Sequence, residues 1–466
     1  MKKYITLLFL LIFWQQNAQD GLLNKMTLSE YLGYVKNYHP IVKQANLVIN
    51  TSEAKLLKAR GAFDPKIEVD FSKKLFKETK YYNKLNGAFK IPTWYGVEFK
   101  ANFDKNEGLY LNNEENLPLD GLYSAGISIS LAKGFLTNKR MATLKQAKYF
   151  VNQAKEDQQI LVNKILYDAS LSYFNWLKTY NEKRVYASFL NNAKVRFKGT
   201  RRAFQEGEKP AIDTLEAGIT LNSRRLNLEK ANIKLIKSSL ALSNYLWLNE
   251  NTPIELKENI IPDLQTFSAI DKTFNIALFN NANFDIERHP KIKSLGFKIQ
   301  SLDVDKRLKK NNLLPKVDVQ YNFLSAANGA QINSFTNNNY KAGLNFSMPI
   351  FIRKERGDLK LARIKLEDKK LENATAKVII KNKINAIQQE LASYLLQTNF
   401  TFKIVRDYAV LLKAEERKFF LGESSLFLVN YREEKYIDSK LKAINLENSF
   451  FKAKASLFKE AVISIN

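Results

Sequence analysis

Residues 39–71 and 289–321 share one pattern of hydrophobic and polar positions. Each segment opens with His-Pro, at His39 and His289, and carries Pro-Lys twenty-five residues after the first proline. Between the two prolines apolar residues recur every three or four positions, which predicts a helix, and beyond the second proline they alternate with polar ones, which predicts a strand. A repeated helix-to-strand unit of this length predicts two similar halves.

Four segments show the alternation of a strand with one apolar and one polar face. They are residues 67–71, 127–131, 317–323 and 344–348, and their polar positions include Glu68, Asp70, Asp318 and Gln320. Pro65 and Pro315 precede the first and third segments, where a missing N–H is tolerated and the preceding residue is driven out of helix. The same alternation also suits an ordinary hairpin packed on a helix of a soluble protein.

Long helical stretches follow the strands in both halves. Residues 138–205 contain no proline and a single glycine, and residues 357–421 contain neither after Gly357. At 1.5 Å per residue each predicts a helix of roughly 100 Å. Glycine-containing turns at Gly207 and Gly422 then reverse the chain into shorter helices, expected at about 211–248 and 426–462. The sequence thus predicts two long antiparallel hairpins, which a non-pore coiled-coil protein would also form.

The first half holds about thirty-four residues more than the second between matched landmarks, and the surplus lies within residues 77–123. This segment is rich in tyrosine, asparagine and glycine. We expect additional strand pairing over residues 88–103 together with a surface loop.

Residues 1–18 have the pattern of a secretory signal peptide. Lys2 and Lys3 precede an apolar run from Ile5 to Trp14, which is too short to span a bilayer, and cleavage is expected near Ala18. The mature chain is then expected to be soluble or to enter a membrane as strands. The chain has no cysteine, so neither a disulfide nor an acylated cysteine anchor is expected.

The charge of the chain is strongly basic. Its 73 Lys and Arg residues fall to 71 without Lys2 and Lys3, and 71 − 47 leaves a net charge of +24. The charges are spread along helices rather than gathered in one stripe with aromatic residues, so no nucleic-acid partner is expected. Basic residues do gather where strand is expected to become helix, as membrane headgroups would favour. These residues are Lys133, Lys139, Arg140, Arg353, Lys354 and Arg356.

No pattern in the sequence indicates an enzyme, a metal site or a cofactor. The chain has no Gly-x-Ser-x-Gly, no phosphate-binding glycine loop with lysine and no His-Glu-x-x-His. His39 and His289 are its two histidines, and a histidine recurring at a helix entry is expected to cap or pack there.

In this order of elements the sequence resembles the TolC family of outer-membrane efflux proteins. The marks are the paired His-Pro entries, the paired proline-to-strand switches, Met348-Pro-Ile-Phe351 followed by basic residues, and the turns at Gly207 and Gly422. The resemblance implies a mainly α fold with β strands, built as two repeats over residues 19–262 and 263–466. The first repeat would place its strands at about 66–132 and its hairpin at about 138–248, and the second at about 316–350 and 357–462.

The resemblance further implies a homotrimer in the outer membrane of a Gram-negative bacterium. Each chain would give two strands per repeat to a twelve-stranded β-barrel closed between chains, and the hairpins would form a periplasmic tunnel. The protein would be the passive exit duct for small molecules such as drugs. Its partners would be a periplasmic adaptor (membrane fusion) protein, an inner-membrane pump of RND or ABC type, and outer-membrane lipid. A duct for type I protein secretion and an exported coiled-coil protein without a pore are the alternatives.

The candidate site lies just beyond the two turns. Six and nine positions after Gly207 stand Asp213 and Glu216, whereas the same steps from Gly422 reach Leu428 and Tyr431. The resemblance implies a cation-binding acidic ring supplied by the second repeat, and this sequence departs from that pattern. We expect either that the two acids simply stabilise a helix N-terminus or that they form lumenal rings, with Leu428 and Tyr431 as an apolar constriction.

Overall fold

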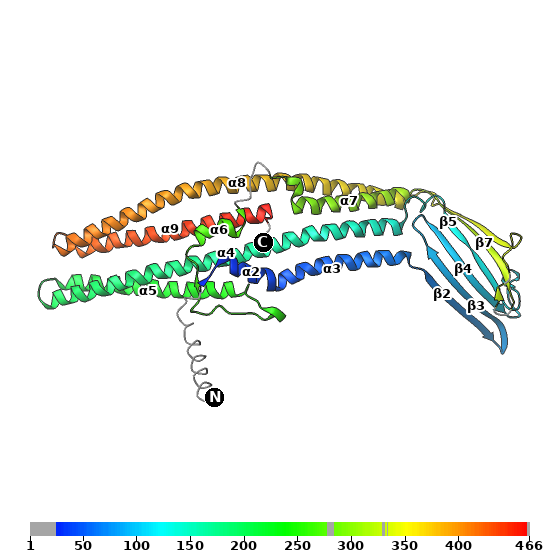
Figure 1. Cartoon of the computed structure of the whole chain (residues 1–466), viewed down its shortest axis with the longest axis horizontal. Coiled ribbons are helices and arrows are strands. Elements are labelled where there is room, and N and C mark those ends of the chain that lie inside the picture. The colour runs from blue at the N-terminus through cyan, green and yellow to red at the C-terminus, as the bar shows by residue number, and fades with distance from the viewer. Residues whose placement is uncertain (1–24, 277–283, 329–330, 333, 464–466) are drawn as a thin grey trace, which may run out of the picture. The chain divides into compact units, whose positions relative to one another are not determined.

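The computed structural model describes residues 25–276, 284–328, 331–332 and 334–463 (Figure 1). The expected signal peptide, residues 1–18, lies outside the described residues. The chain divides into two compact units. One comprises Met1–Asn46, Gln159–His289 and Val378–Asn466, and the other comprises Leu47–Gln158 and Pro290–Lys377.

The predicted switches from helix to strand are present in the second unit. Helix α3 (Pro40–Arg60) passes through the short helix η1 (Gly61–Phe63) into strand β2 (Lys66–Phe76), and helix α7 (Pro290–Asn311) leads to strand β7 (Lys316–Asn328). Each strand therefore begins directly after its proline. The carbonyl of Pro315 accepts a hydrogen bond from the N–H of Lys133 at 3.1 Å, which ties the strand entry to the end of the neighbouring strand.

The strands form one antiparallel sheet in the order β2-β3-β4-β5-β7, with β9 pairing along the other side of β7 (Figure 1). The remaining long strands are β3 (Thr79–Pro92), β4 (Val97–Glu107), β5 (Leu122–Ser130) and β9 (Tyr340–Ser347), and the two-residue strand β8 (Gln331–Ile332) joins the end of β7.

The number of strands differs from what the resemblance implies. The second repeat supplies two long strands, as expected, but the first supplies four, because residues 77–123 contain the whole hairpin β3–β4. The additional pairing expected over residues 88–103 is confirmed, with Phe89 opposite Ala101. The chain therefore has six long strands instead of four in the described sheet.

The sheet has one apolar and one polar face across its whole width. A single row of paired positions crosses all six long strands and is apolar throughout: Ile67, Phe89, Ala101, Ala125, Phe323 and Tyr340. The adjacent row, on the other face, is mainly basic and polar: Lys66, Lys90, Lys100, Gly126, Asn322 and Lys341. The period-two pattern of the separate strands is thus in register over the entire sheet.

Helical hairpins dominate the first unit. Helix α4 (Lys139–Gln205) turns back as α5 (Ala211–Ser243), and α8 (Arg353–Phe420) turns back as α9 (Leu426–Ala461). With 67 residues, α4 is about 100 Å long. The return helix α5 ends at Ser243, five residues before the expected end, and Trp247 then pairs with Pro253 in an isolated bridge.

Aromatic side chains fill the core of the first unit where shorter elements join the long helices. Phe174 of α4 lies 5.2 Å from Phe451 of α9, and Phe274, just after α6 (Thr266–Thr273), stacks on Phe458 at 4.9 Å between ring centres. Tyr173 is also buried there, and burial raises the pKa of its hydroxyl to about 12.

Helix α2 (Leu28–Tyr38) begins at a capping box made by Thr27 and Glu30. The other short elements are β1 (Lys25–Met26), which pairs with β6 (Ile261–Pro262), and η2 (Asn113–Glu115), η3 (Asn249–Asn251) and η6 (Ile286–Arg288).

Both histidines pack in equivalent places, as the sequence predicts. His39 and His289 follow α2 and η6, share backbone angles near φ −63 and ψ 130, and are each 6% exposed. The ring of His39 stacks on Tyr245, and Nε2 of His289 lies 3.1 Å from the carbonyl oxygen of Glu460. Burial lowers the pKa of both imidazoles, so both are neutral at pH 7.

Among the residues that the structure describes, none of the helices contains an apolar stretch long enough to cross a bilayer.

Candidate functional site

The two hairpin turns have the same backbone structure. Gly207 and Gly422 adopt φ values of +80 and +79, which only glycine takes up readily. In the first turn the N–H of Gly207 donates to the carbonyl of Phe204 and that of Glu208 to Ala203, and the second turn repeats both hydrogen bonds with Gly422 and Glu423. This pair of bonds satisfies the last carbonyls of each long helix. The structural role predicted for both glycines is consistent with this geometry.

The helices leaving the turns begin differently. Ser425 caps α9 by accepting a hydrogen bond from the N–H of Leu428 at 3.3 Å, whereas Pro210 precedes α5 without a side-chain cap. Asp213 therefore stands in the first turn of a helix whose N–H groups lack a side-chain acceptor, where a carboxylate is favoured by the helix dipole. Its carboxylate also lies 3.9 Å from the ammonium group of Lys209.

Glu216 is held differently from Asp213. The amide of Asn430 on α9 donates a hydrogen bond to its carboxylate at 2.9 Å, so Glu216 links the two hairpins. Its side chain is half-buried. The structure thus gives each of the two acids a partner within this chain, Lys209 for Asp213 and Asn430 for Glu216.

Leu428 and Tyr431 are both exposed on α9, to 39% and 44%. They lie three positions apart, which places them on one side of the helix. The ammonium group of Lys435 lies 5.3 Å from the centre of the Tyr431 ring, and the guanidinium of Arg432 lies 6.0 Å from it. The first turns of α9 therefore present an apolar and aromatic surface bordered by cations.

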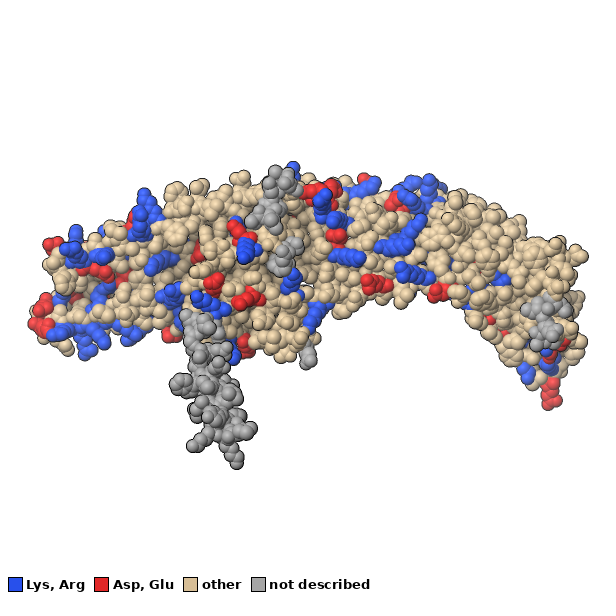
Figure 2. Space-filling view, viewed as in Figure 1, with Lys and Arg blue, Asp and Glu red and all other residues tan. Residues whose placement is uncertain are grey.

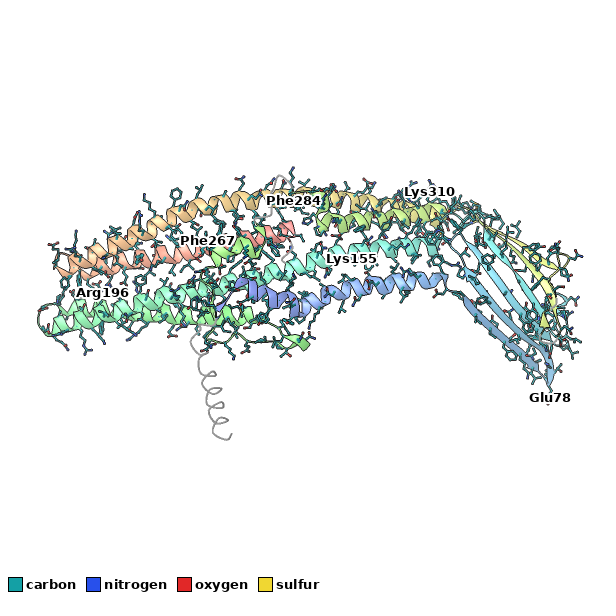
Figure 3. All side chains as sticks on the ribbon, viewed as in Figure 1. Glu78, Lys155, Arg196, Phe267, Phe284 and Lys310 are labelled. Atoms are coloured by element: carbon teal, nitrogen blue, oxygen red, sulfur yellow. The ribbon has the colours of Figure 1, made fainter. Side chains whose placement is uncertain are left out.

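A buried ion cluster further along the hairpins escaped the sequence analysis. Glu433 on α9 has no exposed surface, and its carboxylate lies 2.7 Å from Arg196 on α4 and 3.4 Å from Arg224 on α5. Arg196, labelled near the turn end of α4 in Figure 3, also donates to Asn430 at 3.0 Å and lies 3.5 Å from Glu416 on α8. All four long helices are joined by this cluster.

The sequence does carry a signal for this cluster. Glu433 stands among the buried positions of α9, after Leu426 and Val429 and before Ile437, at steps of three and four residues. A carboxylate on the apolar stripe of a helix requires a buried partner. Val429 and Ile437, on either side of Glu433 along this stripe, pack with Phe189 and Leu412 in an apolar cluster.

Electrostatics distinguish two adjacent acids near the end of α8, Glu416 beside Arg196 and Glu415 beside Arg432. Glu416 is 44% exposed, and the burial of its remaining surface raises the pKa of its carboxyl, against the lowering effect of Arg196. At the neighbouring turn the hydroxyl of Ser424 donates to Glu415 at 2.6 Å and, with Arg432, lowers the pKa of that carboxyl. The tip of the α8–α9 hairpin is thus closed by a charge-assisted hydrogen bond.

Within the described part of the chain, no group of three or more histidine, cysteine, aspartate or glutamate side chains is arranged to hold a metal ion. The hairpin ends therefore offer exposed apolar and charged surfaces together with a buried cluster that fixes the helices against one another.

Known structures share this arrangement over nearly the whole chain. The outer membrane channel CmeC of Campylobacter jejuni matches with a TM-score of 0.65 and 15% identity, covering 94% of this chain and 86% of that one. The outer membrane protein VceC of Vibrio cholerae matches with a TM-score of 0.67 and 12% identity, covering 94% and 97%. The open state of the MtrE outer membrane channel of Neisseria gonorrhoeae matches with a TM-score of 0.63 and 10% identity, covering 93% and 88%.

No protein-family model and no curated protein matches the sequence. The structural matches show that the chain has the fold of these outer-membrane channels, the fold that the resemblance to the TolC family implies.

Proposed function

We propose that the protein is the outer-membrane exit channel of a tripartite efflux system and conducts small molecules passively to the cell exterior. The observation that carries the proposal is the sheet with one apolar and one polar face, joined without interruption to long helical hairpins. An apolar outer face suits lipid and a polar inner face suits water, which is how strands line a membrane channel. The shared fold with outer-membrane channels supports the same conclusion.

Aromatic and basic residues border the apolar face where a membrane surface would lie. Tyr95 and Phe135 pack at 6.5 Å at the end of the sheet next to the helices, and Tyr81 and Tyr110 pack at 4.6 Å at its far end. Aromatic side chains gather at both interfaces of membrane-spanning strands. The basic residues expected at the junction of strand and helix are present there, with Arg353 and Lys354 exposed at the start of α8.

The helices supply a reason for the chain to assemble with copies of itself. One side of α5 packs on α4, whereas its other side carries apolar residues at steps of three, four and seven that are each more than half exposed. These residues are Ile212, Leu215, Ile219, Leu226, Ile233, Ile236 and Leu240. Such a spacing is that of a coiled-coil seam. We assign this seam of α5 to the neighbouring copy in a homotrimer, against the exposed apolar side of its α8, where Leu396 and Phe400 lie.

Within the described residues, the sheet has two open edges that the same assembly would close. Strands β2 and β9 each pair on one side along their length, and unpaired edge groups are costly in lipid. A ring of copies pairs β2 of one with β9 of the next. The hairpin turns then lie at the far end of a periplasmic tunnel, where we place the contacts with an adaptor protein and an inner-membrane pump.

Two measurements test the proposal. After separation of the cell envelope by density, the protein should fractionate with the outer membrane, and the purified protein should conduct ions in planar bilayers. Recovery in the soluble periplasm, or bilayers that stay silent at high protein concentration, would contradict it.

Substitutions at two adjacent positions of α5 test the assembly of the trimer. Leu226→Glu places a charge in the α5 seam and should abolish the trimer in native mass spectrometry. Arg225→Glu changes an exposed residue beside the seam by two charge units and should leave the trimer intact. Intact trimers in both variants would move the interface elsewhere.

A further inference from the structure

The first repeat contains a strand pair beyond the two strands that the resemblance assigns to it, and this pair lies inside the sheet. In the order β2-β3-β4-β5, hairpin β3–β4 separates the strand that follows α3 from the strand that precedes α4. An extracellular loop would instead leave β2 and β5 as neighbours. The position of the hairpin alone therefore requires it to share the environment of the strands on either side.

The side chains of the hairpin follow the two faces of the sheet. On the apolar face, Leu85 and Phe89 of β3 pair with Phe71 and Ile67 of β2. Ile91 of β3 pairs with Phe99 of β4 on the same face. Phe89 and Ile91 are 41% and 36% exposed, so the described residues leave a large part of both side chains uncovered. A surface loop has no reason to keep large apolar residues exposed and aligned with those of a membrane-facing sheet.

Polar groups occupy the other face of the hairpin. Asn102 of β4 donates to the hydroxyl of Ser124 on β5 at 3.1 Å, and Asn86 of β3 is hydrogen-bonded to Asp104 of β4. The hydrogen bond between Asn102 and Ser124 thus joins the added hairpin to the rest of the sheet through the polar face.

The length of the hairpin suits a membrane. From Tyr81 to Ile91 the strand rises ~34 Å, which becomes ~26 Å along the membrane normal for a strand tilted by ~40°. The strand is therefore long enough to cross the apolar band of about 25 Å that outer-membrane strands present to lipid, with Asn83, Lys105 and Glu107 at the far end of the same face. Figure 2 shows a strand region whose visible face bears few charged side chains, with those that are visible gathered mainly toward its far end.

A closed barrel can accommodate hairpin β3–β4 because the hairpin adds an even number of strands to each chain. Each neighbouring pair in the sheet is antiparallel, so the outer strands β2 and β9 run in opposite directions. One added strand would have made the two edges parallel, whereas two preserve the antiparallel pairing of β2 with β9 of the next copy.

We infer that hairpin β3–β4 is part of the transmembrane wall, so that each chain supplies six strands and the trimer closes an eighteen-stranded barrel in place of a twelve-stranded one. Three copies of six strands give this number. Because barrel diameter grows roughly linearly with strand number, the outer mouth is ~1.5-fold wider than that of a twelve-stranded channel. The inference rests on the proposed membrane channel and adds the size of its exit and the lipid contact of the added hairpin.

Single-cysteine labelling tests the inference without background, because the chain has no cysteine. Ala101→Cys and Asn102→Cys report on the apolar and polar faces of β4, and Val319→Cys and Gln320→Cys report on the same two faces of β7. Each variant is labelled with a polarity-sensitive fluorophore, checked for trimers, and reconstituted in vesicles with and without spin-labelled lipid, which quenches fluorophores in contact with acyl chains. Lys100→Cys replaces Asn102→Cys if loss of the Ser124 hydrogen bond prevents assembly.

The expected result is strong quenching at positions 101 and 319 and little at 102 and 320. If 319 and 320 differ while 101 is quenched no more than 102, the added hairpin is outside the membrane and the inference is overturned, although the channel remains. If none of the four positions is quenched, the sheet does not face lipid and the proposed function itself fails.

Discussion

The carboxylate of Glu433 lies 2.7 Å from the guanidinium of Arg196, although the two residues are 237 positions apart and belong to different helical hairpins. Glu433 has no exposed surface, and Arg224 approaches its other oxygen. Two cations therefore share one buried anion, and the removal of that anion would leave only the more exposed Glu416, beside Arg196, to compensate them.

Glu433→Gln should for this reason destabilise the helical unit strongly. Breaking a buried ion pair from one side costs about 3 kcal/mol or more. We expect a clear fall in the denaturant midpoint of the helical circular dichroism signal. Glu416→Gln is the matched control, since this acid contacts the same arginine but is 44% exposed, where an ion pair contributes at most about 1 kcal/mol. Equal effects of the two changes would contradict a special role for the buried anion.

The prolines before the two strands offer a second prediction. Pro65 and Pro315 stand directly before β2 and β7, at the places where helix must stop. Alanine at both sites should let helical structure extend toward the sheet, since it restores the N–H and relaxes the preceding residue. We expect a reduced yield of heat-resistant trimers for the double variant on unheated gels. Normal yield would show that the sheet alone fixes the boundary.

Much of this fold is predictable from the sequence because its signals are repeated. The His-Pro entries, the proline switches and the glycine turns each occur twice at matched spacing, and all of them mark backbone conformations that few residues allow. The period of two in β2, β5, β7 and β9 identifies strands with two different faces.

The rest depends on contacts between distant residues. The strand Thr79–Pro92 has a less regular alternation, with Asn83 and Gly87 on its apolar side, so its place in the sheet follows only from its register with β2 and β4. Similarly, Glu433 stands at a core position, but its partners Arg196 and Arg224 come from two other helices. The spacing of residues along one helix does not reveal which charged residues of other helices a buried side chain contacts.

The pH dependence of stability should include a contribution from Glu447. This residue lines an apolar hollow of about 310 Å³ beside Phe267, Phe402 and Ile444, and burial raises the pKa of its carboxyl. A carboxyl with a raised pKa in the folded state costs no stability at low pH, where it is protonated in both states. The cost appears as the pH rises from the unfolded-state pKa near 4.5 through the folded pKa, and is complete above it.

Glu447→Gln should therefore raise the unfolding midpoint at pH 7.5 and leave it unchanged at pH 3.5. Thermal unfolding of the detergent-solubilised protein over this range measures the difference. Glu434→Gln, a change of an exposed glutamate on the same helix, controls for the general loss of a charge. A stabilisation that is the same at both pH values would exclude titration of Glu447 as its cause.

We propose that the two acids beyond the first turn line the lumen at the end of the hairpins, although the structure gives each a partner. Asp213 approaches Lys209, and Glu216 binds Asn430. If threefold symmetry arranges them as rings around the lumen, Asp213→Asn with Glu216→Gln should lower the preference for cations. The measurement is the reversal potential in a salt gradient. Glu206→Gln, directly before Gly207 in the same turn and paired with Arg202 at 2.8 Å, is the control.

Tyr431 is the residue whose loss should change the resting current most. Its ring is 44% exposed on α9, with cations at 5.3 and 6.0 Å from its centre and with the exposed Leu428 one turn before it. Around a threefold axis these side chains would form an apolar constriction. Tyr431→Ala removes a ring that the backbone turn does not need, since the hydrogen bonds of that turn come from Gly422 and Glu423. The resting single-channel conductance should therefore rise while the trimer stays intact. Tyr408→Ala, further along α8, should leave the conductance unchanged, and an equal current in wild type and Tyr431→Ala would place the constriction elsewhere on the hairpins.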